Sequence, residues 1–458
     1  MPQHLDALII GAGQAGPSLA ARLAASGRRT AIVERLRFGG TCVNVGCMPT
    51  KALVASARAI HMARRGDEFG FATAGEVRAD MRRIKARKDA IVAESCEGIE
   101  RWLRGTPNLT VLQGHARFTA PRTVSVDGES MEAGEIFINV GARAIVPDMA
   151  GARDPRCLTN STILDLDAAP DHLVIIGGSY IGLEFAQVFR RFGSRVTVVE
   201  RSDRLIGRDD EDVSAGLREV LDGEGIAFRL SATCIDVQPG ATTVSVGVDC
   251  THGAPRIEGS HVLFAIGRRP NTDDLGLDRA GIATDAHGYI QVDDQGRTSV
   301  DGVWALGECN GHGAFTHTSY NDYEVVVANL LDGDPRRLSD RIPCYALYTD
   351  PPVGRAGMTL RDARATGRPL LVGSRPMTRV SRATEMGETH GFMRAIVDGE
   401  TRRILGAVVF GVGGDEVVHS LLDVMYAGAS VSTIARGVHI HPTITELVPT
   451  MLQELVPL

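Results

Sequence analysis

The sequence lacks the features of proteins that bind nucleic acids or span membranes. Its 458 residues carry a formal net charge of −7, so no excess of basic residues is available to bind a phosphate backbone. The richest basic cluster, at 82–88, is soon followed by acidic residues, and apolar residues recur around it at helical spacing, which predicts a helix with a solvated face. No apolar run approaches the ~18 residues that a membrane-spanning helix needs, and no signal peptide precedes the first expected strand, at 5–10. We therefore expect a cytoplasmic protein that binds neither nucleic acid nor membrane.

Cysteine is also scarce, and most of it forms no local pattern. Six of the eight cysteines are scattered without the spacing of metal ligands, so we expect small buried side chains, a reducing compartment and no metal site. These six are Cys96, Cys157, Cys234, Cys250, Cys309 and Cys344. Only Cys42 and Cys47 form a pair, separated by four residues within GGTCVNVGCMPTK (39–51). Set among glycines and followed by a proline and a lysine, they indicate a redox-active disulfide. The alternative is a pair of structural cysteines.

Glycine, in contrast, is frequent, with 52 residues, which suits an α/β protein with many tight strand-to-helix turns. The first apolar strand runs into Gly11, Gly13 and Gly16, an alanine-rich helix follows at 19–25, and a second strand ends at Glu34. This order is typical of a dinucleotide-binding unit. Its glycines let the backbone approach a pyrophosphate at the helix N-terminus, and its acid accepts hydrogen bonds from ribose hydroxyls.

The same unit recurs later in the chain. Gly177, Gly178 and Gly182 follow an apolar strand, and a second strand ends at Glu200, at the spacing that separates Gly11 from Glu34. Ser179 stands where the first unit has its middle glycine, and it is still small enough for a fairly close backbone approach. Two Rossmann-type units imply two bound dinucleotides. The alternative is that only one of the two is occupied.

The rest of the sequence predicts strands and a change of domain. Short strands are expected at 124–126, 136–140 and 234–248. The polar, turn-rich stretch at 331–337 indicates a boundary, beyond which we expect a hairpin of strands at 392–397 and 404–410 and a helix at 416–427.

These motifs, in this order, resemble the pyridine nucleotide-disulfide oxidoreductases, the class I flavoprotein disulfide reductases that include glutathione reductase, dihydrolipoamide dehydrogenase and mercuric reductase. The resemblance covers nearly the whole chain and is nearest to the mercuric-reductase-like branch. It rests on the two dinucleotide fingerprints, the cysteine motif, GRRPNT at 267–272, the Gly307-Glu308 turn and HPTITE at 441–446. It implies an α/β fold with two Rossmann-type domains and an α+β dimerisation domain. The expected division is FAD binding at 1–147 and 270–335, NAD(P)H binding at 148–269 and dimerisation at 336–458.

The resemblance also implies a set of cofactor-binding residues for FAD and NAD(P)H. Tyr180 resembles the tyrosine that covers the nicotinamide pocket beside the flavin, and Glu308 departs from the aspartate of most relatives. The full set is Gly11, Gly13, Gly16, Glu34, Gly40, Thr41, Lys51, Ala116, Gly141, Gly177, Gly178, Tyr180, Ile181, Gly182, Glu200, Arg201, Gly267, Gly307 and Glu308.

The catalytic set follows from the same resemblance. NAD(P)H would reduce FAD, which would pass two electrons to the Cys42–Cys47 disulfide. Cys47, nearer the flavin in the family, would be the charge-transfer thiolate, and Cys42 the thiol that attacks the substrate. His441, oriented by Glu446, would come from the other subunit of a homodimer to move the proton, and would otherwise be a capping or core histidine. Lys51 and Glu184 resemble the ion pair beside the reactive flavin nitrogen. We expect His439, two residues from His441, to be structural.

The choice of nucleotide and substrate stays open at this point. Glu200 favours NADH, because a carboxylate repels a 2′-phosphate, whereas Arg201 and Arg204 could admit NADPH. The C-terminus lacks the cysteine pair with which mercuric reductases collect their metal. We therefore expect a reductase of a disulfide or a small thiol-reactive oxidant. The alternatives are a Hg(II) or Cu(II) reductase, a dihydrolipoamide dehydrogenase-type subunit of a larger complex, and a redox sensor with negligible turnover.

Overall fold

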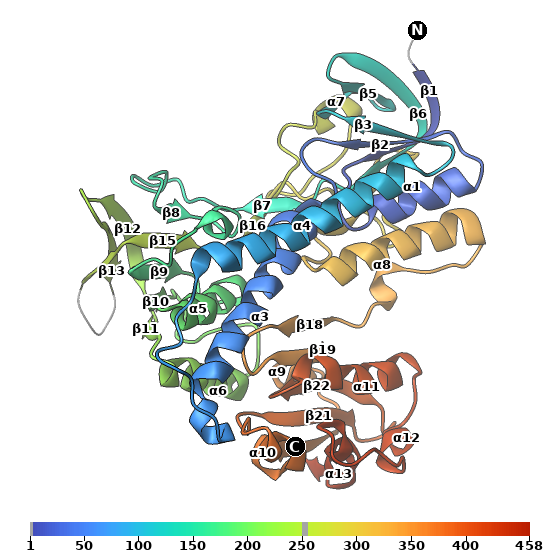
Figure 1. Ribbon diagram of the computed structural model, residues 1–458. Coiled ribbons are helices and arrows are strands. Elements are labelled where there is room, and N and C mark those ends of the chain that lie inside the picture. The colour runs from blue at the N-terminus through green and yellow to red at the C-terminus, as the bar shows by residue number, and fades with distance from the viewer. Residues whose placement is uncertain (1–2, 250–254) are drawn as a thin grey trace.

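The computed structural model describes residues 3–249 and 255–458, and Figure 1 shows their arrangement. Cys250 lies outside these ranges, so the expectation of a buried thiol there is not addressed, and the same holds for the side chain of Cys234. None of the helices within the described ranges is long and apolar enough to span a membrane. The four-segment division of the chain stays a prediction.

The first Rossmann-type unit forms a seven-stranded sheet in the order β3-β2-β1-β6-β5-β4, with β17 added along β6. β1, β2, β3, β6 and β17 run parallel, and β4 and β5 form an antiparallel extension. The strands are β1 (Gln3–Ile10), β2 (Thr30–Glu34), β3 (Leu109–Gln113), β4 (Ala116–Ala120), β5 (Thr123–Val126), β6 (Glu129–Ile138) and β17 (Val303–Ala305).

Helices from three parts of the chain cover one face of this sheet. Alternate strand residues such as Ile9, Ile32 and Phe137 pack against them in one core, as the period of two in a strand requires. The helices are α1 (Gly16–Ala25), α4 (Met81–Arg104) and α8 (Thr316–Val327). The expected helix with a solvated face is α4, whose N-cap Asp80 accepts a hydrogen bond from the backbone N–H of Arg83 at 3.1 Å.

The second unit is a five-stranded parallel sheet in the order β11-β10-β9-β15-β8, flanked by an antiparallel sheet of β12, β13 and β14. A short antiparallel ribbon of β7 and β16 joins the two units. The strands are β7 (Ala142–Ala144), β8 (Cys157–Leu158), β9 (His172–Ile176), β10 (Arg195–Val199), β11 (Ala227–Arg229), β12 (Thr233–Pro239), β13 (Val244–Asp249), β14 (Arg256–Gly259), β15 (His261–Phe264) and β16 (Arg268–Pro270). Its helices are α5 (Tyr180–Phe192) and α6 (Glu211–Gly223).

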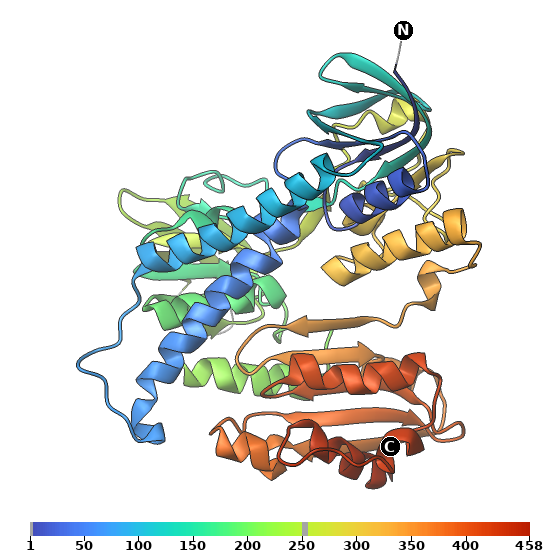
Figure 2. The same cartoon turned by 45° about the vertical axis from the view of Figure 1, so that its right-hand side comes forward.

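The C-terminal part is an antiparallel sheet in the order β18-β19-β22-β21-β20-β23. One face packs against α11, α12 and α13, which Figure 2 brings into view. The expected hairpin and helix are β21, β22 and α11. The bounds are β18 (Cys344–Leu347), β19 (Val353–Gly357), β20 (Leu370–Pro376), β21 (Phe392–Asp398), β22 (Ile404–Phe410), β23 (Val456–Pro457), α9 (Leu360–Ala365), α10 (Ser381–Glu385), α11 (Gly414–Tyr426), α12 (Ser432–Ala435) and α13 (Val448–Gln453).

The other face of this C-terminal sheet shares a core with the second unit. Val353 of β19 and Val408 and Phe410 of β22 belong to the same buried cluster as residues of α3 (Cys47–Arg64), α5 and α6. A Cβ atom on Gly216 of α6 would lie 2.8 Å from Cε1 of Phe410, so the helix and the strand are in close contact. This packing positions α3, which carries Cys47 and Lys51, between the nucleotide units and the C-terminal sheet.

Candidate active site

The two predicted phosphate turns have the same backbone geometry. Gly11 and Gly177 have φ angles of +103° and +115°, and a Cβ atom on either would lie 2.3 Å from the carbonyl oxygen of Asn139 or Ala265. Only glycine can occupy such a position, because its backbone adopts positive φ without strain and approaches the neighbouring strand closely. Both turns therefore have the backbone geometry that a dinucleotide-binding site requires.

The acid at the end of each second strand is bound to its own turn. One carboxylate oxygen of Glu34 accepts a hydrogen bond from the N–H of Ala12 at 2.8 Å, and the other accepts one from Leu36 at 2.8 Å. Glu200 repeats this pattern with the N–H groups of Gly178 at 2.7 Å and Ser202 at 2.8 Å. Because a carboxylate offers about four lone-pair sites, each acid retains capacity to accept from a ribose hydroxyl.

One cavity of about 2320 Å³ connects both turns with both cysteines. It is large enough to hold two dinucleotides, since ordinary ligand pockets span about 300–1,000 Å³. Most of the predicted cofactor-binding residues line it. The exceptions are Gly16, Gly182 and Gly307, which are buried behind its wall. The lining residues include Gly13, Gly40, Thr41, Ala116, Gly141, Ile181, Arg201 and Gly267.

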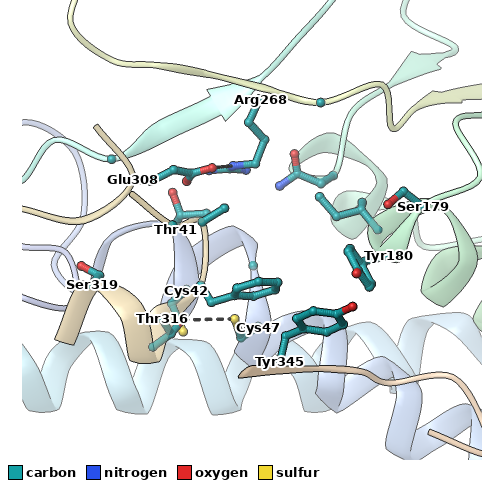
Figure 3. A pocket seen from close by; sticks show the side chains of 18 of the residues that line it. Thr41, Cys42, Cys47, Ser179, Tyr180, Arg268, Glu308, Thr316, Ser319 and Tyr345 are labelled. Atoms are coloured by element: carbon teal, nitrogen blue, oxygen red, sulfur yellow. Dashed lines mark hydrogen bonds and ion pairs between the residues drawn. The ribbon is translucent and has the colours of Figure 1, made fainter. Parts of the chain in front are cut away.

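The two thiols of the predicted disulfide lie at one helix junction and are free in this structure. Cys42 lies in α2 (Gly40–Val45), and Cys47 is the first residue of α3. The Sγ atom of Cys47 lies 3.4 Å from Oγ1 of Thr316 (Figure 3). Hydrogen bonding from Cys42, then from Thr316, and the charge of Lys51 lower the pKa of Cys47 to about 5, although burial opposes this. The same contact, together with burial, raises the pKa of Cys42. The reduced pair therefore holds its negative charge on Cys47.

Lys51 and Glu184 form the expected ion pair inside the cavity. Nζ of Lys51 lies 2.8 Å from Oε2 of Glu184, which comes from α5 and whose side chain is 7% exposed. The other oxygen of Glu184 accepts a hydrogen bond from the N–H of Tyr348 at 3.0 Å, and the Tyr348 ring lies 4.5 Å from Nζ of Lys51. Contacts from two other segments, α5 and the one that carries Tyr348, therefore fix the position of this cation.

Tyr180 belongs to an aromatic cluster beside the cysteines (Figure 3). Its ring centroid lies 5.3 Å from that of Tyr345 and 6.2 Å from that of Phe315, both in edge-to-face geometry. Phe315 also stacks on Tyr345 at 5.7 Å. These rings form an apolar wall between Cys47 and the second phosphate turn.

Comparison with known proteins agrees with this geometry. Residues 5–326 match the sequence profile of the pyridine nucleotide-disulphide oxidoreductases, and residues 344–452 match that of their dimerisation domain. The chain belongs to this family. It is therefore a flavin-dependent pyridine nucleotide-disulfide oxidoreductase, an enzyme that uses FAD and a pyridine nucleotide, as the sequence predicted.

Individual relatives of this oxidoreductase span almost its full length. It is 34% identical to the probable pyridine nucleotide-disulfide oxidoreductase RclA of Escherichia coli (strain K12), over 96% of this chain and 97% of that protein. It is 31% identical to the dihydrolipoyl dehydrogenase of Thermus scotoductus over 96% of this chain and 95% of that protein. It is 30% identical to the mercuric reductase of Lysinibacillus sphaericus over 97% of this chain and 81% of that protein. Among solved structures, the Cu(II) complex of the HOCl-induced flavoprotein disulfide reductase RclA from Escherichia coli matches with a TM-score of 0.90, at 33% identity over 99% of both chains.

The residues present fit the cofactors that this oxidoreductase family uses. The first turn, Glu34 and Ala116 offer a glycine-lined cradle for an adenosine diphosphate, and the second turn with Glu200 offers another. Glu308, in place of the aspartate that the family resemblance leads us to expect, forms an ion pair with Arg268 at 2.7 Å, and each of these side chains is 15% exposed. The longer carboxylate is thus held at the cavity wall by a neighbouring guanidinium.

Sequence reasoning missed several residues that shape the oxidoreductase site. Oδ1 of Asn139 accepts from the N–H of Gly16 at 3.0 Å, and its Nδ2 donates to the carbonyl of Leu306 at 2.9 Å, so it ties the first turn to the Gly307-Glu308 turn. Asp322, buried in α8, accepts from the N–H of Gly307 at 2.7 Å and pairs with Arg341. Arg268, the partner of Glu308, was also missed. It lies within the motif GRRPNT at 267–272, so a closer reading of that motif could have found it.

His441 and Glu446 lie elsewhere in the chain. Nδ1 of His441 is 2.7 Å from Oε2 of Glu446, as predicted, and the His441 side chain is 73% exposed. Neither residue lines the cavity within the described part of this chain. His439, expected to be structural, is half-buried and bonds the carbonyl of Thr445 at 3.0 Å within its own loop.

The remaining described cysteines only partly match the expectation of buried thiols. Cys96 and Cys309 are buried, but Cys157 and Cys344 are half-buried, so the expectation was wrong for these two. Both lie in edge strands of their sheets, β8 and β18, where a neighbouring strand covers one side only. The described residues contain no group of His, Cys, Asp or Glu side chains that could hold a metal ion.

Proposed function

We propose that this chain is a homodimeric, NADH-preferring reductase whose Cys42–Cys47 pair reduces a disulfide or a small thiol-reactive oxidant. The observation that carries the proposal is the unequal pair of thiols in the cavity shared by both nucleotide turns. FAD, when bound, supplies the two-electron relay between a reduced nicotinamide and this pair.

The chain's own residues account for the exchange steps. Because the charge of the reduced pair lies on Cys47, Cys42 carries a proton that a base must remove before its sulfur attacks. For a disulfide substrate, the Cys42 thiolate bonds to one sulfur and displaces the other as a thiolate, which takes up the proton. Cys47 then attacks Sγ of Cys42, which releases the second sulfur as a thiolate that takes a proton from solvent, and closes the Cys42–Cys47 disulfide.

His441 of the partner subunit would hold the proton between these steps. Its Nδ1 bonds Glu446, which leaves Nε2 as the atom that takes the proton from Cys42 and returns it to the leaving thiolate. The dimerisation profile at 344–452 and the exposure of Val438 (99%) and Ile440 (79%) beside His441 support an interface at this loop.

NADH is favoured by the contacts at the end of β10. Glu200 retains its carboxylate where a 2′-phosphate would lie, and Arg204 is engaged by Glu211 at 2.9 Å and by the carbonyl of Gly207 at 3.2 Å. Arg201, in contrast, is exposed at the cavity, and it is the side chain that would bind the 2′-phosphate if the enzyme used NADPH.

The proposed substrate class follows that of a relative, the HOCl-induced flavoprotein disulfide reductase RclA from Escherichia coli. The relatives named dihydrolipoyl dehydrogenase and mercuric reductase supply the two alternatives that the test must separate. The test is a consumption screen of NADH and NADPH against oxidised glutathione, lipoamide, Hg(II), Cu(II) and hypothiocyanous acid. We expect the highest kcat/KM with NADH and a disulfide or oxidant. A lipoamide rate equal to that of a dedicated dehydrogenase would overturn the ranking.

A further inference from the structure

Tyr345 of β18 connects the aromatic wall to a buried carboxylate of the nucleotide-binding unit. Its hydroxyl donates to Oδ2 of Asp209 at 2.9 Å, while its ring meets that of Tyr180 at 5.3 Å with an interplanar angle of 66°. Figure 3 shows the side chains of Tyr345 and Tyr180 next to each other in the cavity. One residue of the C-terminal sheet thus contacts both the β10–α6 loop and the first residue of α5.

Asp209 is itself firmly held. Its side chain is fully buried, and the guanidinium of Arg355, which is 1% exposed, pairs with Asp209 and, at 2.9 Å, with Asp210. Arg394 binds the same Asp210 oxygen at 2.9 Å. Although burial opposes ionisation of the Asp210 carboxyl, the charge of Arg355 lowers its pKa, so this carboxyl stays charged. Such a cluster orients the Asp209 oxygen that receives the Tyr345 hydroxyl, because a paired buried charge cannot move without losing its partner.

The loop that carries Asp209 also contacts the second phosphate turn. Ile206 donates its N–H to the carbonyl of Gly178 at 2.9 Å and accepts from the N–H of Asp209 at 2.7 Å. Its φ angle is +40°, a strained value for a β-branched residue, which the surrounding bonds must hold in place. The anchor of Tyr345 is therefore continuous with the turn that receives the pyridine nucleotide.

We propose that Tyr345 is a positioning residue for the nicotinamide pocket, whose hydroxyl, anchored on Asp209, holds its ring against Tyr180 and stabilises Tyr180 in its covering position. The proposal rests on the proposed function and on the family resemblance, by which Tyr180 would cover the nicotinamide pocket beside the flavin. In the covering position Tyr180 would block the nicotinamide, so the measured affinity for the nucleotide would be reduced by the fraction of closed molecules.

The test is calorimetric binding of NAD⁺ and ADP-ribose to the FAD-loaded dimer. Tyr345→Phe removes the hydroxyl and keeps the ring, so we expect NAD⁺ to bind about three- to tenfold more tightly because the closed position loses its anchor. ADP-ribose lacks the nicotinamide, so its affinity should stay unchanged. Tyr323→Phe, a tyrosine of α8 outside the cavity, is the matched control and should change neither affinity.

A second experiment, in a Tyr180→Ala protein, distinguishes an effect of Tyr345 that acts through Tyr180 from a general loosening of the pocket. If Tyr345 acts through Tyr180, Tyr345→Phe should have no effect on NAD⁺ affinity in a Tyr180→Ala protein, which has no ring to hold. Tyr345→Leu, which also removes the ring, should tighten NAD⁺ binding at least as much as Tyr345→Phe. If one of the two variants folds poorly, the other still tests the proposal. The proposal fails if NAD⁺ affinity is unchanged in both Tyr345 variants, if ADP-ribose affinity shifts equally, or if the effect persists in Tyr180→Ala. Wild-type protein that binds neither ligand would instead contradict the proposed function itself.

Discussion

At the scale of single residues, the two thiols of the reduced pair differ because they have different neighbours. Cys47 begins a helix of 18 residues and contacts Thr316, with the charge of Lys51 nearby, whereas Cys42 contacts Cys47 itself and lies deeper. A helix N-terminus and a nearby cation stabilise a thiolate. The division of labour between the two sulfurs thus has a local electrostatic cause.

This difference predicts opposite behaviour of two serine variants. In the holoenzyme with oxidised flavin, before NADH is added, Cys42→Ser should already show the long-wavelength absorbance of a thiolate beside the flavin, because Cys47 remains and has no disulfide partner. Cys47→Ser should lose it entirely, and both variants should lose disulfide reductase activity. Stopped-flow spectra give the answer, and a band that survives in Cys47→Ser would reverse the assignment.

The lowered pKa of Cys47 also predicts the pH range over which its thiolate persists. A free thiol ionises at about 8.5, whereas the Cys47 pKa lies at about 5. The thiolate is therefore complete above the lowered value and is lost only as pH falls through it. We expect the thiolate absorbance of the reduced enzyme to stay constant from pH 8 to about pH 6 and to decline below that. A midpoint near the free-thiol value would show that the surroundings do not stabilise the charge.

At the scale of elements, the structure depends on single polar side chains that join strands distant in sequence. Asn139, directly after β6, bonds the first turn of α1 and the end of β17, and both partners are buried. Removing its amide takes the acceptor from the N–H of Gly16, and it leaves the carbonyl of Leu306 with the weak thiol donor of Cys309 at 3.3 Å. A buried group without a partner costs about 1–3 kcal/mol, and the loss of the bond to Leu306 adds about 1 kcal/mol.

Asn139→Ala should therefore lower the free energy of unfolding by about 2–4 kcal/mol and speed the release of FAD. Urea unfolding followed by flavin fluorescence measures both effects. Asn329→Ala is the matched control, because Asn329 donates two hydrogen bonds to Val325 and Arg336 away from the cavity. If both variants lose FAD at the same rate, Asn139 has no particular role in holding the turn.

The difference between local motifs and contacts that join distant elements explains what the sequence could and could not predict. Gly11 to Glu34 and Gly177 to Glu200 lie within single strand–helix–strand units, so their chemistry can be read from local order, and the cysteine motif is contiguous. Asn139 bonds a residue 123 positions away, and Tyr345 one 136 positions away. No local pattern distinguishes such residues from ordinary polar or aromatic ones, because their role arises only when distant elements pack together. The family resemblance supplied Lys51–Glu184 and His441–Glu446, which no spacing in the sequence pairs.

At the scale of the whole molecule, the proposed site is divided between two subunits. His441 and Glu446 are paired and oriented but lie outside the cavity that holds Cys42 and Cys47 in the same chain. In the proposed homodimer, this exposed and carboxylate-held histidine would act on the cysteine pair of the partner subunit.

Mixing two inactive variants tests this arrangement. A heterodimer of Cys42→Ser and His441→Gln chains contains one site with both lesions and one site with neither. Random subunit exchange should therefore restore about a quarter of the wild-type activity, since half of the dimers are mixed and half of their sites are intact. Each variant alone stays inactive under the same conditions. No recovery in a verified heterodimer would place both groups in one subunit.

The core that α3, α5 and α6 share with β19 and β22 has a consequence for how the molecule unfolds. Phe410 and Val408 are buried against helices of the nucleotide-binding unit, so neither part can lose its structure without exposing apolar surface of the other. Denaturation of these parts should therefore be a single cooperative event, visible in calorimetry as one heat-absorption peak. A chain ending at residue 335 should lose this cooperativity and aggregate. The C-terminal sheet is then required for the folding of each chain on its own, quite apart from its part in joining two chains.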